Sequence, residues 1–139
     1  MVRVTYLVQR KGAKEGFEIV CESWKTSKDE VVLVTSVSAM FFAKNGKYRE
    51  AEDAIAHAIV IGMCFGHFHH SAYGIASAYA IMNTREQAVK WLQETADDGF
   101  PCYPTFEQDS NLDNLREDAR FIAFMSKLKQ QWQHYKDTL

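Results

Sequence analysis

An internal repeat is the feature that most constrains what this sequence can fold into. Residues 41–51, Phe-Phe-Ala-Lys-Asn-Gly-Lys-Tyr-Arg-Glu-Ala, align with residues 78–88, Ala-Tyr-Ala-Ile-Met-Asn-Thr-Arg-Glu-Gln-Ala. An aromatic residue followed by alanine recurs in register, as does the closing alanine, and Ala51 and Ala88 are 37 residues apart. Repetition at such a period is typical of arrays of helical hairpins, in which each unit buries its apolar face against the next.

Apolar residues at helical spacing predict two helices in the first unit. The first is expected over residues 29–44, where these residues recur three and four apart: Val32, Thr35, Ala39, Phe42 and Ala43. Ser27 and Glu30 form a capping box at its start, and Asn45-Gly46 is suited to end it in a left-handed conformation. The second helix is expected over residues 48–61. The valines of the first segment leave a strand as the alternative there.

The second unit predicts two more helices. Residues 68–82 are dense in small side chains, which let two helices approach closely. A further helix is expected to begin after Thr84 and to stop at Asp97-Asp98-Gly99. Thr84 and Gln87 form a second capping box, so the Thr84 side chain is predicted to cap this helix.

The segments outside the two units follow other patterns. The two prolines, Pro101 and Pro104, predict a connector over residues 100–111 with one helical turn. A short helix is expected at 112–117 and a longer one at 118–136, whose apolar stripe consists of Phe121, Phe124, Met125, Leu128 and Trp132. Residues 1–26 fit either a degenerate helical hairpin or a short strand followed by a helix, since Val2, Val4 and Tyr6 alternate with polar residues.

The two units resemble tetratricopeptide repeats, whose usual period is about 34 residues. The motif positions hold Thr35, Ser38-Ala39, Phe42, Gly46, Ala51, Ile55, Ala58 and Met63 in the first unit, and Ala72, Ile75-Ala76, Tyr79, Asn83, Ala88, Leu92, Thr95 and Phe100 in the second. An insertion at Gly62–His69 fits the longer period. The motif's initial tryptophan and both closing prolines are missing, as are the turn glycine and second alanine of the second unit.

The C-terminal part resembles the module that closes tetratricopeptide arrays in many bacterial proteins. The matching residues are Ala88–Leu92, Asp98-Gly99-Phe100, Asp109, Leu112, Leu115-Arg116, Asp118 and Arg120-Phe121, with Ala119 where a proline is usual. The resemblance implies an all-α fold, a right-handed stack of antiparallel helical hairpins with a C-terminal capping helix. One domain is expected over residues 1–139: a degenerate hairpin or extension at 1–27, repeats at 28–62 and 66–99, and a closing module at 100–139.

Composition and motifs argue against several classes of function. The net charge of −2 and the pI of about 6.2 do not give the basic face that nucleic-acid binding usually needs. The longest apolar stretch, Ala54–Phe65, contains His57 and is too short to span a membrane, and the N-terminus is too interrupted for a signal sequence, so we expect a cytoplasmic protein. No motif of an enzyme active site is present, and we expect neither catalysis nor a cofactor.

The one unusual cluster is Gly66-His67-Phe68-His69-His70. His67 and His70 are three residues apart and would share a helix face, as metal ligands can. No carboxylate or cysteine at a supporting spacing completes a set of three or four ligands. Surface histidines at the start of a helix are therefore the preferred interpretation, and no metal site is predicted.

In the resembled family, the first helix of each hairpin lines a concave groove. Carried over by position, this groove is expected to be lined by Leu33, Ser36, Met40, Ala43, Lys44, His70, Tyr73, Ser77, Ala80 and Ile81. These residues are mostly apolar, with one cation and a His-Tyr pair, so an amphipathic helix or an extended peptide would suit the groove. The chain's own last helix could equally fill it.

These observations predict a non-catalytic module that binds or scaffolds other proteins. Two alternatives remain open. The chain could be the regulatory C-terminal fragment of a larger bacterial signalling protein, because such modules often follow a kinase, cyclase or DNA-binding domain. It could also bind a small molecule or a metal through the cluster at His67–His70. A homodimer is a further expectation, because aromatic-rich helical stacks can pair through an uncapped end.

Overall fold

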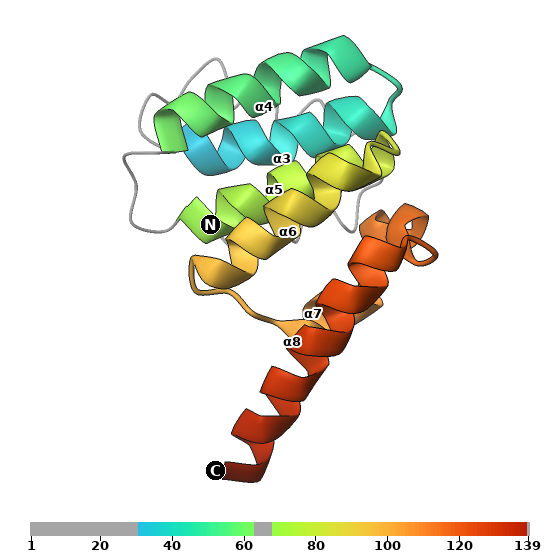
Figure 1. Ribbon diagram of the computed structural model, residues 1–139. Coiled ribbons are helices and arrows are strands. Elements are labelled where there is room, and N and C mark those ends of the chain that lie inside the picture. Colours follow the sequence, from blue (N-terminus) through green and yellow to red (C-terminus); the bar gives the residue numbers. More distant parts are fainter. Residues whose placement is uncertain (1–30, 63–67, 139) are drawn as a thin grey trace.

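The computed structural model describes residues 31–62 and 68–138, and every regular element in these ranges is a helix (Figure 1). The elements are α3 (Val31–Lys44), α4 (Tyr48–Gly62), α5 (Phe68–Ile81), α6 (Arg85–Asp97), α7 (Tyr103–Gln108), the 3₁₀ helix η1 (Ser110–Leu115) and α8 (Ala119–Thr138). The all-α prediction is confirmed for the described residues, and the strand alternative is wrong for residues 31–44, the described part of the segment predicted at 29–44. The hairpin or strand expected at 1–27, and the Ser27 cap, lie outside the described residues.

The helices α3 to α6 form two hairpins stacked on each other. Figure 1 shows that each of these helices runs opposite to the one before it, so α3 and α5 run in the same direction. α3 packs against both α4 and α5, and α5 packs against α6. η1 packs on α5, while α8 contacts α6 and α7. Across the described ranges, no helix is both long enough and apolar enough to cross a bilayer.

Three of the helices end in the same way, with one residue in the left-handed conformation. These residues are Gly46 (φ 70°), Asn83 (φ 60°) and Gly99 (φ 107°). The residue after each donates a backbone hydrogen bond to a carbonyl five positions earlier: Lys47 to Phe42 at 2.9 Å, Thr84 to Tyr79 at 2.9 Å and Phe100 to Thr95 at 3.0 Å. These bonds satisfy carbonyls that a helix end leaves unpaired. The predicted stops of all three helices are confirmed.

The helix starts agree less well with the capping predictions. Thr84 precedes α6, but its side chain makes no capping hydrogen bond, and its ψ of 69° differs from the extended backbone of a usual N-cap. Asp109, before η1, has extended backbone at ψ 114°, and its carboxylate accepts from Asn111 N–H at 2.8 Å. The predicted connector contains α7, with Pro104 in its first turn, where the missing N–H is tolerated.

Two hydrophobic clusters form the core. The first joins α3, α4 and α5 and is built mainly of small side chains: Ala39, Ala43, Ala51, Ala54, Ile55, Ala58, Ile75 and Ala78. The second joins α5 and α6 to the C-terminal segment and is built of larger ones, including Leu92, Tyr103, Phe106, Leu112, Leu115, Phe121, Met125 and Leu128. Alanine on both sides of a helix contact lets the backbones come close, so the first two hairpins pack tightly.

The closest approach of α3 and α5 lies at Ser36 and Gly74. A Cβ atom built on Gly74 would lie 3.0 Å from both Cβ and Oγ of Ser36 and 3.3 Å from its carbonyl carbon. Few Cβ contacts in proteins are this short, so an alanine at position 74 would fit only if Ser36 or its helix moved by a few tenths of an ångström. Ser36 itself is 0% exposed.

We predict that Gly74→Ala destabilises the protein. Overpacking costs about 1–3 kcal/mol, whereas alanine gains at most about 1 kcal/mol over glycine in a helix interior. Urea unfolding of the wild type, Gly74→Ala, Ser36→Gly and the double variant would measure this, with a favourable coupling expected in the double-mutant cycle. A Gly74→Ala variant as stable as the wild type would contradict the tight contact.

We predict that Asn83→Ala destabilises the turn between α5 and α6, while Asn83→Gly does not. An alanine in the left-handed conformation costs about 1–2 kcal/mol, and glycine adopts it freely. Both variants lose the hydrogen bond from Arg85 Nε to Asn83 Oδ1, so their difference isolates the backbone effect. Thermal unfolding would report it, with the exposed Gln87→Ala as the control. Equal stability of the two Asn83 variants would show that the left-handed residue is not what matters there.

Candidate functional site

The predicted groove residues lie on α3 and α5, but they differ in what a ligand could reach. Ser36 and Ser77 are 0% and 1% exposed, and Ser36 packs against Gly74. Ala43 and Ala80 are also buried, within the two hydrophobic clusters. This corrects the expectation that these four side chains line an open groove, because a ligand cannot reach them. The side chain of Leu33 lies outside the described residues.

Four of the predicted residues remain accessible. Met40 and Ile81 are half-buried and pack against the alanine-rich cluster of α3, α4 and α5. Lys44 is exposed at the last position of α3, and His70 is exposed in the first turn of α5. The accessible surface therefore combines two apolar side chains with a cation near one end of the helix pair and a histidine near the other.

Tyr73 is the predicted residue that the structure places most differently. Its hydroxyl donates a hydrogen bond to the carboxylate of Asp109, and its ring stacks on Phe106 with the centroids 5.3 Å apart. Phe100 meets both rings edge-on, at 6.2 Å from Tyr73 and 6.0 Å from Phe106. Tyr73 is therefore occupied by the chain's own C-terminal segment. α8 is not among the elements that pack on α3 or α5, so the alternative that the last helix fills the groove finds no support among the described residues.

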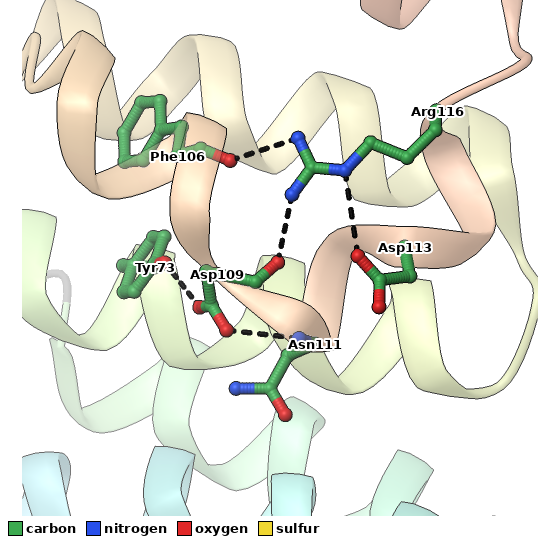
Figure 2. A network of polar contacts seen from close by, with 6 residues as sticks. All are labelled: Tyr73, Phe106, Asp109, Asn111, Asp113 and Arg116. Atoms are coloured by element: carbon green, nitrogen blue, oxygen red, sulfur yellow. Dashed lines mark hydrogen bonds and ion pairs between the residues drawn. The ribbon is translucent and has the colours of Figure 1, made fainter.

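Asp109 and Arg116 hold this segment together (Figure 2). Asp109 accepts from Tyr73 through one carboxylate oxygen and from Asn111 N–H through the other. The guanidinium of Arg116 donates to the carbonyls of Phe106 at 3.2 Å and Asp109 at 2.9 Å, and its Nε lies 3.5 Å from Asp113. Arg116 thus binds the carbonyl of Phe106 in the last turn of α7, and it shares the carbonyl of Asp109 with the N–H of Leu112. Asn114 adds a bond to the carbonyl of Ala80 in α5 at 3.0 Å.

The phenol of Tyr73 is held in its neutral form. Burial, together with the hydrogen bond to Asp109 and the negative charge of that carboxylate, raises the pKa of Tyr73 far above its ordinary value. The carboxylate and the phenol are mutually satisfied, as are the guanidinium and its carbonyls. The role of this network is therefore to fix the α7–η1 segment on α5.

The histidine cluster lies beside the same segment. His69 Nδ1 is 3.5 Å from Asp98 Oδ2, which ties the start of α5 to the end of α6. The His69 ring stacks on Phe100 at 6.2 Å and contacts His70 at 4.3 Å. His67 lies outside the described residues. Within the ranges that are described, no three His, Cys, Asp or Glu side chains gather as a group that could hold a metal ion.

Several residues that complete this site were not predicted as part of it. Phe100, Asp109 and Arg116 belong to the pattern that resembles a closing module, and for Asp109 and Arg116 that pattern was the only sequence signal. Nothing in the pattern shows that they meet Tyr73, because that contact joins positions 36 residues apart. Asn114 carries no sequence signal at all.

We predict that Tyr73→Phe destabilises the protein by about 1–3 kcal/mol, the range for a buried hydrogen bond to a charged group, while the stacking on Phe106 is kept. The effect should depend on pH. In the unfolded chain a tyrosine ionises near pH 10, whereas folded Tyr73 stays neutral above that pH. Wild-type stability should therefore fall as pH rises beyond about 10, and fall less steeply in Tyr73→Phe.

Denaturant unfolding at a series of alkaline pH values would measure this difference. Tyr48→Phe is the matched control, because Tyr48 is 52% exposed on α4. If Tyr73→Phe and Tyr48→Phe followed the same pH dependence, the phenol of Tyr73 would not be held neutral by its surroundings.

Comparison with known proteins assigns no family to the chain: no protein-family model, curated protein or solved structure matches it. Inference about function therefore rests on the surface of α3 and α5 and on the segment that closes it.

Proposed function

We propose that this chain is a non-catalytic interaction module of tetratricopeptide-repeat type, which binds a peptide or a helix of another protein. The observation that best supports this is the parallel, side-by-side packing of α3 and α5, the first helices of the two hairpins (Figure 1). Ser36 meets Gly74, which is 38 residues later and within one residue of the sequence repeat. Positions of the two units that lie side by side in space are thus separated along the chain by nearly the length of the sequence repeat.

The C-terminal segment continues this arrangement. η1 packs on α5, and its Asn114 binds the carbonyl of Ala80. In a stack of helical hairpins this is the position that the first helix of a third repeat would take. The α7–η1 segment then acts as the closing module, since it covers the apolar side of α5 that a last repeat would otherwise expose.

The accessible residues suggest the chemistry of the partner. Met40 and Ile81 offer partly exposed apolar contacts, and Lys44 stands at the end of α3 that lies beside the end of α5. Apolar anchors beside a single cation suit a short amphipathic segment with apolar residues and one carboxylate. Most of the affinity would come from burial of the apolar side chains, and Lys44 would orient the bound segment by attracting its carboxylate.

We predict that peptides selected from a random displayed library will be apolar with at least one acidic residue. We further predict that the double variant Met40→Asp, Ile81→Asp will lower the affinity for these peptides at least tenfold. A buried charge in place of an apolar anchor removes the burial that drives binding. Fluorescence anisotropy with the selected peptides would give the affinities, and amide shifts of Met40, Lys44 and Ile81 would locate the site.

Val60→Asp is the control, because Val60 is an apolar residue of α4 that is 71% exposed and is not among the proposed binding residues. It should leave the affinity unchanged. Peptides that bind the double variant and the wild type equally, or that lose affinity only in Val60→Asp, would show that the partner surface lies elsewhere.

A further inference from the structure

The contact between Ser36 and Gly74 sets how α3 and α5 are aligned along their length. The two helices lie side by side and run in the same direction, so a residue of α3 is level with the residue 38 positions later in α5. Lys44 is therefore level with the residue after Ile81. Met40 is four residues before Lys44, on the same face of α3 and about 6 Å away along the helix axis. The cation and the two apolar side chains thus stand in a fixed order.

The surface of α3 and α5 offers little to hydrogen-bond the backbone of an extended peptide. Ser36 and Ser77 are buried, and the hydroxyl of Tyr73 is bound to Asp109. The side-chain amide of Asn114 donates to a carbonyl of α5 at 3.0 Å. An extended peptide buried here would leave backbone N–H and C=O groups without partners, which is unfavourable. An α-helix pairs these groups within itself, so the surface is better suited to a helix.

Lys44 is the only aspartate, glutamate, lysine or arginine in α3 and α5. Lys47 and Arg49 follow it in the turn and in the first residues of α4, and both are exposed. Four acids stand at this end of the elements that pack on α3 and α5: Glu50 and Glu52 of α4, Glu86 of α6 and Asp113 of η1. The last two lie 3.4 Å from Arg120 and 3.5 Å from Arg116. A ligand that lies along α3 and α5 therefore meets the cation of these helices at this end.

The ends of α3 and α5 favour one direction for a bound helix. Both helices have their C-termini beside Lys44, and a helix C-terminus carries partial negative charge. A helix that runs antiparallel to them brings its partly positive N-terminus to this end. A carboxylate is also most favourable in the first turn of a helix, so the same direction suits the carboxylate that Lys44 attracts. A parallel helix would bring three C-termini together and would place the carboxylate in its last turn.

We propose that the segment bound on α3 and α5 is an amphipathic helix that runs antiparallel to them, with a carboxylate in its first turn at Lys44. Its apolar residues pack on Ile81 and Met40. This proposal rests on the binding function proposed above and adds the partner's conformation, its direction and the position of its acid. In the partner's sequence the acid precedes an apolar anchor by about four residues, whereas an extended peptide would span the same 6 Å in about two.

Peptides selected from the displayed library on the wild-type chain test the conformation. The selected sequences should share an acid three or four residues before an apolar residue. A proline in the middle of a selected peptide, and a synthetic peptide with the reversed sequence, should each bind at least tenfold more weakly in fluorescence anisotropy. An acid two residues from the anchor, an acid that follows it, or a reversed peptide or proline variant of unchanged affinity overturns the antiparallel helix.

A nitroxide label on the peptide tests the direction. His70, in the first turn of α5, is about 18 Å along the axis from the level of Lys44. A label at the peptide N-terminus should broaden the amide signal of Lys44 more than that of His70, and a label at the C-terminus should do the reverse. The opposite pattern overturns the proposed direction.

Charge reversal tests the role of Lys44. Lys44→Glu should lower the affinity for the selected peptides several-fold, and lysine in place of the peptide's acid should restore it. Lys90→Glu is the matched control, because Lys90 is an exposed lysine of α6 outside the proposed site. Unchanged affinity in Lys44→Glu, or an equal loss in Lys90→Glu, overturns the pairing with Lys44.

The double variant Met40→Asp, Ile81→Asp separates this proposal from the binding function on which it rests. Peptides that bind the double variant as well as the wild type show that the surface itself is wrong. Peptides that lose affinity for it, yet tolerate proline or show the opposite broadening, leave the surface in place and overturn only the antiparallel helix.

Discussion

The contact between Ser36 and Gly74 is the constraint on which the rest of this structure depends. A Cβ on residue 74 would lie 3.0 Å from Ser36, so α3 and α5 approach each other closely at this point. This approach lets alanines fill the core between the two hairpins, since larger residues would hold the helices apart. Because α4 runs back between them in the chain, α3 and α5 point in one direction and lie side by side.

The C-terminal segment covers apolar surface that the two hairpins do not bury between themselves. α5 and α6 have apolar sides that face away from α3 and α4, and a stack that ended there would expose them. Bulky residues of α7, η1 and α8 cover these sides, and the polar network of Tyr73, Asp109 and Arg116 holds them in place. Packing supplies most of the stabilisation, while the hydrogen bonds specify which way the segment lies.

The proposed peptide-binding surface follows from how far this closure extends. Along α3 and α5 the segment covers Tyr73 and the carbonyl of Ala80, while Met40, Lys44 and Ile81 stay accessible.

The sequence by itself determined the helices and their ends. Asn45-Gly46, Asn83 and Gly99 stop helices through a local backbone conformation, and the repeat of alanines marks the hairpins, so both are visible without tertiary information. Which small residues line a groove and which are buried between helices was decided only by the tertiary structure. Ser36, Ser77 and Tyr73 satisfy the groove pattern equally well in sequence, yet the two serines are buried and the tyrosine is engaged by Asp109. Such contacts join residues that are distant along the chain, and periodicity within one helix cannot report the element that will pack against it.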